Sequence, residues 1–205
     1  MRVTGGRVKG PMFIEDGLGT KRCLILGLGD VLRGDEGLGC YVLEALAGEP
    51  WSAPVFLAYA GNDARPAAGL IHGAQLVMVV GTFDLGGAAG RIHPWTFARF
   101  RSHLKWMADE CPRVRLLAST LARAEMAGGI PEDICFPWIQ PRLIEGYGLS
   151  REARRAMWKT VGRIKRRLFE TGFLPQEALS VFPLLRVEPG DCHPSWSRRG
   201  EYESG

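Results

Sequence analysis

The chain has 205 residues, of which 46% are hydrophobic and 23% are charged. These proportions are typical of one water-soluble domain, and a chain of this length can bury a core without disulfides or a structural metal. The five cysteines are scattered and form no C-x-x-C pair, which argues against a zinc ribbon and a disulfide scaffold. No apolar run approaches the roughly 18 residues of a membrane helix, so we expect a cytoplasmic protein with no membrane contact.

The net charge of +4 at pH 7 raises the question of a nucleic-acid partner. Much of the excess positive charge lies in residues 151–168, where arginines and lysines are interspersed with apolar residues at spacings of three and four. This pattern predicts an amphipathic helix whose basic face is solvated. We therefore expect no nucleic-acid partner.

The N-terminal part of the chain begins with residues 1–20, which are rich in glycine, show no periodicity and are expected to form a flexible leader. Residues 22–28 are an apolar run that ends in glycines, which predicts a strand buried on both faces. A helix is predicted over residues 36–47, because glycine and proline follow its apolar face. Residues 55–59 predict a second strand, and residues 64–71 predict a helix capped by the preceding aspartate.

The third predicted strand, over residues 75–80, has the clearest apolar run of the chain. After it, the glycine-rich residues 85–90 predict an irregular loop, and residues 94–108 predict a helix. Residues 114–118 are another apolar run, which we interpret as a strand, and residues 119–126 are interpreted as a short helix.

Residues 134–139 predict the last strand, and the basic helix over residues 151–168 follows it. Because strands and helices alternate, the sequence predicts a three-layer α/β/α fold, in which helices cover both faces of a mainly parallel sheet of about five strands. Residues 21–174 are expected to form this single domain. Residues 175–205 have no periodic pattern and predict an irregular C-terminal tail that can be mobile.

The loop after the first predicted strand reads G-L-G-D-V-L-R-G-D-E-G-L-G over residues 27–39. Ligands of open parallel sheets bind outside the carboxyl ends of the strands, so this loop is the first candidate for a binding site. A dinucleotide fingerprint needs glycine where Leu32 stands, and a phosphate-binding loop needs lysine where Asp35 stands. We therefore expect no nucleotide cofactor.

Two neighbouring acids, Asp35 and Glu36, stand in this loop near the start of the following helix. The helix dipole favours ionised carboxylates at that position, which suits the coordination of a cation. The same pattern is also ordinary capping of a helix N-terminus, which needs no metal. The residues alone leave both interpretations open.

The stretch L-I-L-G-L-G-D-V-L-R-G-D-E-G-L-G-C-Y-V-L-E-A-L resembles the opening of the hydrogenase maturation proteases, whose pattern is a strand, then G-x-G-N-x-L-x-G-D-[DE]-G-x-G, then a helix. Downstream, L-V-M-V-V-G-T-F-D-L-G-G-A-A-G-R-I is similar to the third-strand segment of that family. A-S-T at residues 118–120 resembles its S-T-H segment, and I-Q-P at residues 139–141 its I-Q-P segment. The resemblance extends over residues 22–168 in the expected order.

This resemblance implies a function in hydrogenase maturation. Members of the family remove a C-terminal peptide from the precursor of the nickel-iron hydrogenase large subunit, and a Glu, an Asp and a His of the protease bind the nickel that this substrate carries. Such ligands suit divalent nickel. In this sequence the glutamate matches Glu36, whereas Gly81 replaces the aspartate and Leu121 replaces the histidine. The resemblance therefore implies either an active endopeptidase with a rearranged site or a non-proteolytic chaperone that binds the large-subunit precursor.

Other residues could take part in such a site. Asp84 follows Gly81 by three residues, and His93 follows the glycine-rich loop. Ser119 and Thr120 lack a neighbouring histidine, so the sequence predicts no catalytic nucleophile. The expected contacts with the nickel of the substrate are Glu36, Asp84 and His93. The expected substrate-binding loop contains Asp30, Gly34, Asp35 and Gly37.

Overall fold

The computed structural model describes residues 22–131 and 133–175. The leader expected over residues 1–20 and nearly all of the tail expected over residues 175–205 lie outside the described residues. The described residues form one sheet of five strands with helices on both faces, as the sequence predicts. Within these ranges, no helix is long and apolar enough to cross a membrane.

The sheet has the strand order β2-β1-β3-β5-β4. Strand β1 pairs in parallel with β2 and β3, and β3 pairs in parallel with β5, so the carboxyl ends of these strands meet at one edge. The outer strand β4 runs antiparallel to β5. The strands are β1 (Cys23–Leu28), β2 (Val55–Gly61), β3 (Leu76–Thr82), β4 (Ile92–Thr96) and β5 (Asp133–Ile139).

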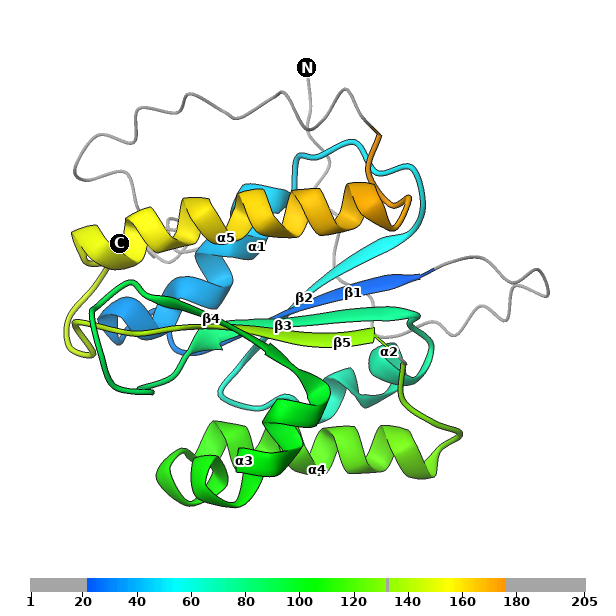
Figure 1. The fold of residues 1–205 in the computed structure, drawn as a ribbon, viewed down its shortest axis with the longest axis horizontal. Helices are drawn as coiled ribbons and strands as arrows, with labels where there is room; N and C mark the ends of the chain where they lie inside the picture. The colour runs from blue at the N-terminus through cyan, green and yellow to red at the C-terminus, as the bar shows by residue number, and fades with distance from the viewer. Residues whose placement is uncertain (1–21, 132, 176–205) are drawn as a thin grey trace, which may run out of the picture.

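Figure 1 shows the three layers: α1 and α5 cover one face of the sheet, and α2, α3 and α4 cover the other. Short 3-10 helices, η1 and η2, precede α1 and α2. The helices are η1 (Gly34–Gly37), α1 (Leu38–Leu46), η2 (Arg65–Ala67), α2 (Ala68–His72), α3 (Phe97–Glu110), α4 (Pro112–Met126) and α5 (Arg151–Glu170).

The central strands are apolar along their whole length because both of their faces are covered. Every residue of β1 and β3 is buried. Ile25 and Met78 belong to the core under α1 and α5, whereas Leu24 and Val77 belong to the core under α2, α3 and α4. Since neighbouring residues of a strand point to opposite faces, one continuous apolar run supplies both cores.

Helix α5 confirms the predicted amphipathic basic helix. Ser150 caps its N-terminus, because the serine hydroxyl accepts a hydrogen bond from Ala153 N at 3.2 Å. Buried residues recur along one side of the helix, and most of its arginines lie on the other. One cation turns inward: Lys165 is 2% exposed, and its Nζ atom lies 2.9 Å from Glu49 Oε1.

The strand predicted over residues 114–118 is wrong, because these residues belong to α4. Val114, Leu117 and Leu121 are buried at the spacing of one helix face. A run of five apolar residues fits a buried helix face as well as a strand, and here the longer helical period decides.

The fifth strand is instead β4, at the start of the helix predicted over residues 94–108. Thr96 ends β4 and caps α3, because its hydroxyl accepts a hydrogen bond from Arg99 N at 3.3 Å. Helices α3 and α4 therefore follow one another without a strand between them, and the predicted alternation fails at this point.

Candidate functional site

Loops that follow β1, β3 and β5 meet at the carboxyl edge of the sheet. The loop after β3 is tied to the end of β5, because Leu85 N donates to Gln140 Oε1 at 2.9 Å and Gln140 Nε2 donates to Asp84 Oδ1 at 2.8 Å. Asp35, from the loop after β1, is hydrogen-bonded to residues 142–150. This edge is the candidate site, in agreement with the rule for open parallel sheets.

Asp35 is fully buried and stabilises the loop after β5. Its Oδ2 atom accepts hydrogen bonds from Arg142 N at 2.8 Å and Leu143 N at 3.0 Å. The Ser150 hydroxyl donates to the same oxygen at 2.8 Å, and Ser150 N donates to Oδ1 at 2.6 Å. These bonds use most of the acceptor capacity of the carboxylate. Asp35 thus fixes one loop against another, and substrate binding by its side chain stays a prediction.

Two glycines of the same loop allow this close contact between backbones. Gly34 has a φ of +52°, and a Cβ atom there would lie 2.7 Å from the carbonyl oxygen of Leu143. Its N–H donates to Gly146 O at 2.6 Å. A Cβ atom on Gly37 would lie 2.9 Å from Val31 Cα. A side chain on Gly34 would push the two loops apart, and a side chain on Gly37 would clash with the backbone of its own loop, so both positions require glycine.

Glu36 is buried in an ion pair with Arg113, which comes from the first turn of α4. Arg113 Nη1 lies 2.7 Å from Glu36 Oε2, and each side chain is 10% exposed. Arg113 Nη2 also donates to the carbonyl oxygen of Thr82, at the end of β3, at 3.2 Å. Arg33 Nη1 lies 3.5 Å from the same Glu36 oxygen. The glutamate is therefore neutralised by guanidinium groups from its own chain.

Strand β3 offers no carboxylate at the position where the resemblance implies an aspartate. A Cβ atom on Gly81 would lie 3.2 Å from Leu28 Cβ and 3.4 Å from Trp138 Cζ3. Trp138 is fully buried and pairs with Gly81 across the sheet. Leu28 and the indole of Trp138 already fill the space around this position, so glycine fits here for a packing reason.

Asp84 stabilises its own loop and joins it to the end of β5, whereas Asp30 accepts a hydrogen bond within its own loop. Gln140 Nε2 and, at 3.0 Å, Gly86 N donate to Asp84 Oδ1, and these bonds lower the pKa of the carboxyl group below its ordinary value. Asp30 Oδ1 accepts a hydrogen bond from Leu32 N at 2.9 Å. Both arrangements are typical of aspartates in turns. The ligand role of Asp84 and the substrate role of Asp30 stay predictions.

His93 lies in β4, at the outer edge of the sheet. Gly81 and His93 pair with opposite sides of Trp138, so β5 separates them. Since neighbouring strands are about 4.8 Å apart, the backbone of His93 is about 10 Å from that of Gly81. Burial, followed by the charges of two nearby arginines, lowers the pKa of the imidazole. The separation argues against one metal shared by His93 and a ligand at the position of Gly81.

The segment similar to S-T-H lies in the middle of α4 and not at the carboxyl edge. Leu121 is 4% exposed and belongs to the core, and the Thr120 hydroxyl donates to Leu116 O at 2.8 Å. The residue of α4 that reaches Glu36 is Arg113, which the sequence analysis missed. One local signal marks it, because a cation in the first turn of a helix opposes the helix dipole and is favoured only beside an anion.

The residues around Glu36 do not fit a transition-metal site. Among residues 22–131 and 133–175, no cluster of three or more His, Cys, Asp or Glu side chains could hold a metal ion. Arg113 and Arg33 both approach Glu36, and their positive charges repel a divalent cation. The ion pair itself supplies the positive charge that the buried carboxylate needs.

The fold of the described residues is similar to that of solved hydrogenase maturation endopeptidases. The chain is similar in structure to hydrogenase maturating endopeptidase HybD from E. coli, with a TM-score of 0.67 and 19% sequence identity. This match covers 75% of this chain and 95% of that chain.

Archaeal proteins share the fold as well. A hydrogenase 2 maturation peptidase from a Thaumarchaeota archaeon matches with a TM-score of 0.56 and 22% identity, covering 73% of this chain and 99% of that chain. The [NiFe] hydrogenase maturation protease HybD from Thermococcus kodakarensis matches with a TM-score of 0.55 and 23% identity, covering 72% of this chain and 98% of that chain. No protein-family model and no curated protein matches the chain. At these identities the likeness establishes the shared fold.

Proposed function

We propose that this chain is a cytoplasmic hydrogenase maturation factor of the maturation-protease family, and that it binds the precursor of a nickel-iron hydrogenase large subunit without cleaving it. The fold of the solved hydrogenase maturation endopeptidases and the G-D-E-G motif over residues 34–37 support the family and the partner. The observation that carries the non-proteolytic role is the ion pair between Glu36 and Arg113.

The charges at this edge explain why the ion pair favours binding without nickel recognition. In the family, the matching glutamate is implied to bind the nickel of the substrate together with an aspartate and a histidine. Here Arg113 binds one carboxylate oxygen of Glu36, Oε2, and Gly81 contributes no ligand. A nickel ion that bound Oε2 would have to displace a guanidinium group and leave it buried without its anion, which is costly, and a nickel ion that bound Oε1 would be repelled by the same guanidinium group.

Exposed apolar side chains on the loops after β1 and β5, here called the apolar rim, support binding of a protein partner. Leu32 and Tyr147 are 60% and 71% exposed, and Leu143 and Ile144 are 44% and 47% exposed. These side chains come from the two loops that Asp35 joins. Exposed apolar side chains on two joined loops are typical of contacts with another protein.

A second candidate function is an active endopeptidase with a rearranged site. The observation that favours it is Glu36 itself, which the chain retains at the carboxyl edge of the sheet. In that case a bound precursor would displace Arg113, and Glu36→Gln would abolish processing.

Incubation with the precursor separates the two functions. The chain is mixed with nickel-loaded and with nickel-free large-subunit precursor, and the mass of the precursor and its co-purification with the chain are measured. We expect an unchanged mass and equal co-purification with both forms. A shortened precursor that appears only with nickel and is lost with Glu36→Gln would establish the endopeptidase instead. Absence of co-purification together with an unchanged mass would refute both functions.

A further inference from the structure

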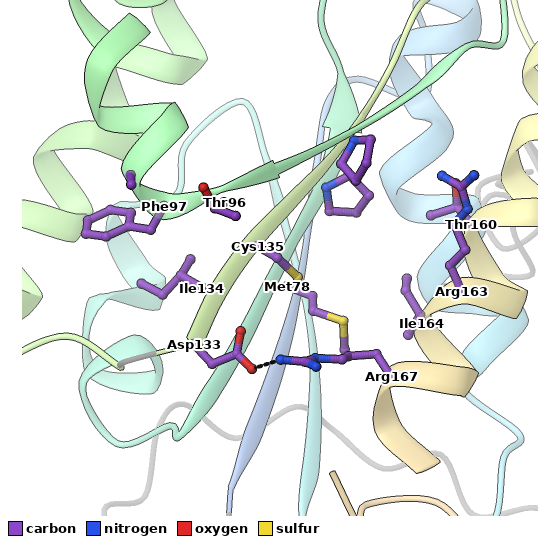
Figure 2. Close-up of a pocket in the computed structure, with 13 residues that line it drawn as sticks. Met78, Thr96, Phe97, Asp133, Ile134, Cys135, Thr160, Arg163, Ile164 and Arg167 are labelled. Carbon is purple, nitrogen blue, oxygen red and sulfur yellow. Dashed lines mark hydrogen bonds and ion pairs between the residues drawn. The ribbon is translucent and has the colours of Figure 1, made fainter. Parts of the chain in front are cut away.

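A cavity of about 620 Å³ lies between α5 and the strands β4 and β5, at the opposite end of the sheet from Glu36. It begins near Asp133, at the amino end of β5, whereas Glu36 lies beyond the carboxyl end of β1. Figure 2 shows Thr160, Arg163 and Ile164 on the α5 side of this cavity, across from Met78 and Cys135 on the strands. Cavities of roughly 300–1,000 Å³ hold small molecules in other proteins.

The cavity exists because the helices cover the two faces of β5 unequally. Ile134, Phe136 and Trp138 belong to the core under α2, α3 and α4. The alternate residues Cys135 and Pro137 point to the other face, where they line the cavity. Helix α5 packs over α1 and the middle of the sheet, and it leaves the β4–β5 side of this face open.

Apolar side chains form most of the cavity wall. Pro94 of β4 and Pro137 of β5 are paired in register and lie beside Met78 and Ile164. Such a wall is suited to packing against an apolar chain.

One cation at the cavity has no described anionic partner. Arg167 forms an ion pair with Asp133, as Figure 2 shows. Arg163 lies one turn earlier on α5, is exposed, and pairs with no carboxylate within residues 22–131 and 133–175. The cavity thus combines an apolar wall with one unpaired guanidinium group.

A buried hydroxyl group adds a second polar feature beside Arg163. Thr160 is 0% exposed, and its Oγ1 atom has no hydrogen-bond partner among the described residues. Residues three apart on a helix are neighbours on its surface, so Thr160 and Arg163 form one polar end of the wall. Six buried side-chain atoms of the described residues lack a hydrogen-bond partner, and among them Thr160 Oγ1 is the one that belongs to a residue of the cavity wall.

We propose that this cavity binds a small amphiphilic carboxylate. Its apolar chain packs between Ile164 and the two prolines of β4 and β5, and its carboxylate pairs with Arg163. Guanidinium groups bind carboxylates through two parallel hydrogen bonds, and burial of the apolar chain supplies the rest of the affinity. The cavity and its ligand are independent of hydrogenase maturation.

Titration with three ten-carbon probes tests the proposal on the full chain. Decanoate, decanol and decylamine are added below their aggregation concentrations, and the heat of binding is measured. We expect decanoate to bind at one site, and decanol to bind about 10-fold or more weakly because it lacks the charged contact. Equal affinity for decanol and decanoate, preferred binding of decylamine, or no binding of decanoate would each overturn the proposal.

Two arginine variants locate the anchor. Arg163→Gln is expected to weaken decanoate binding about 10-fold or more, because it removes the positive charge and keeps a polar side chain. Arg166→Gln is the matched control, since Arg166 is also exposed on α5 but does not line the cavity. Equal affinities of the two variants would show that Arg163 is not the anchor and would overturn the proposal.

The thiol of Cys135 reports directly on occupancy of the cavity. Burial raises the pKa of this thiol to about 11, so its slow alkylation by iodoacetamide is followed at mildly alkaline pH and mapped by mass spectrometry. Cys111 lies between α3 and α4, outside the cavity, and is the internal control. Decanoate at ten times its dissociation constant should slow alkylation of Cys135 about 10-fold and leave Cys111 unchanged.

The same experiments distinguish binding of decanoate elsewhere, and binding of a second copy of the chain, from the proposed binding. Bound decanoate that leaves alkylation of Cys135 unchanged would place the ligand elsewhere. A second copy of the chain in the cavity would give a dimer in sedimentation, with Cys135 protected before any ligand is added. Either result would overturn the proposal.

Discussion

Asp35 and Glu36 are neighbours in the sequence, yet the structure uses their carboxylates differently. Asp35 is fully buried and accepts hydrogen bonds from Arg142, Leu143 and Ser150, in a segment more than a hundred residues away. Glu36 keeps 7% exposure and pairs with Arg113. One acid joins two loops, and the other is held at the edge where the loops meet.

The difference shows that two neighbouring acids can have separate roles: Asp35 maintains the structure of the loops, and Glu36 lies in the candidate site. Asp35 needs backbone donors, which only a specific loop conformation supplies. Glu36 needs only a positive charge, and the chain meets that need with Arg113. The architectural acid therefore tolerates less change than its neighbour, which replacement of each residue can test.

The largest expected effect is that of Asp35→Asn. The amide group would place a donor against N–H groups that now donate to the carboxylate, so buried donors would lose their acceptor. We expect the free energy of unfolding to fall by about 3 kcal/mol in urea denaturation. Asp30→Asn is the control, because Asp30 caps its loop near the surface, and its effect should stay within about 0.5 kcal/mol. Equal effects of the two variants would contradict the architectural role.

The next effect is that of separating Glu36 from Arg113. Arg113→Met leaves a mostly buried carboxylate without its main partner and should lower the free energy of unfolding by about 2 kcal/mol. The double variant with Glu36→Gln should recover part of this loss, giving a coupling energy of about 1 kcal/mol in a double-mutant cycle. Purely additive single effects would show that the ion pair contributes nothing to stability.

A smaller effect is expected where β3 meets Trp138. Gly81→Ala adds a Cβ atom at 3.2 Å from Leu28 Cβ and should destabilise the fold by about 1 kcal/mol, because the neighbours have to move. Gly48→Ala is the matched control, since a Cβ atom there meets nothing within 4 Å. A neutral effect of Gly81→Ala in the same measurement would show that packing against Leu28 and Trp138 does not account for the glycine.

The smallest effect concerns the titration of Asp84. Gln140 holds the pKa of this carboxyl below its ordinary value of 3.8, so the folded chain releases the proton more readily than the unfolded chain. The resulting stabilisation is present above pH 3.8 and is lost as the pH falls through the lower pKa of the folded state. In Gln140→Leu, an NMR titration should show the pKa of Asp84 rising toward 3.8. An unchanged pKa would assign the shift to another group.

The layers of the fold could be predicted because the central strands are read from local sequence. Residues 22–28 and 75–80 are apolar runs, which is what a strand covered on both faces requires. Residues 134–139 are a similar run, although one face of β5 borders the cavity. The strand β4 was missed because Pro94 and two polar residues interrupt it, and an edge strand needs little apolar surface.

The site could be predicted only in part. The sequence located the loop of residues 29–37, because glycines and acids mark it. The partners of those acids lie far away in the chain and depend on how α4 and residues 140–150 pack, which no local period encodes. Arg113 was missed for this reason, although a cation in the first turn of a helix is itself a weak signal.

The hydrogen bonds of Asp35 have a consequence for the binding of a partner at the apolar rim. Leu32 lies on one of the joined loops, and Leu143, Ile144 and Tyr147 lie on the other. Since the two segments are clamped together before contact, an incoming molecule meets a contour that already exists and loses less conformational entropy on docking. Asp35 can thus affect the affinity for a binding partner that its side chain does not contact.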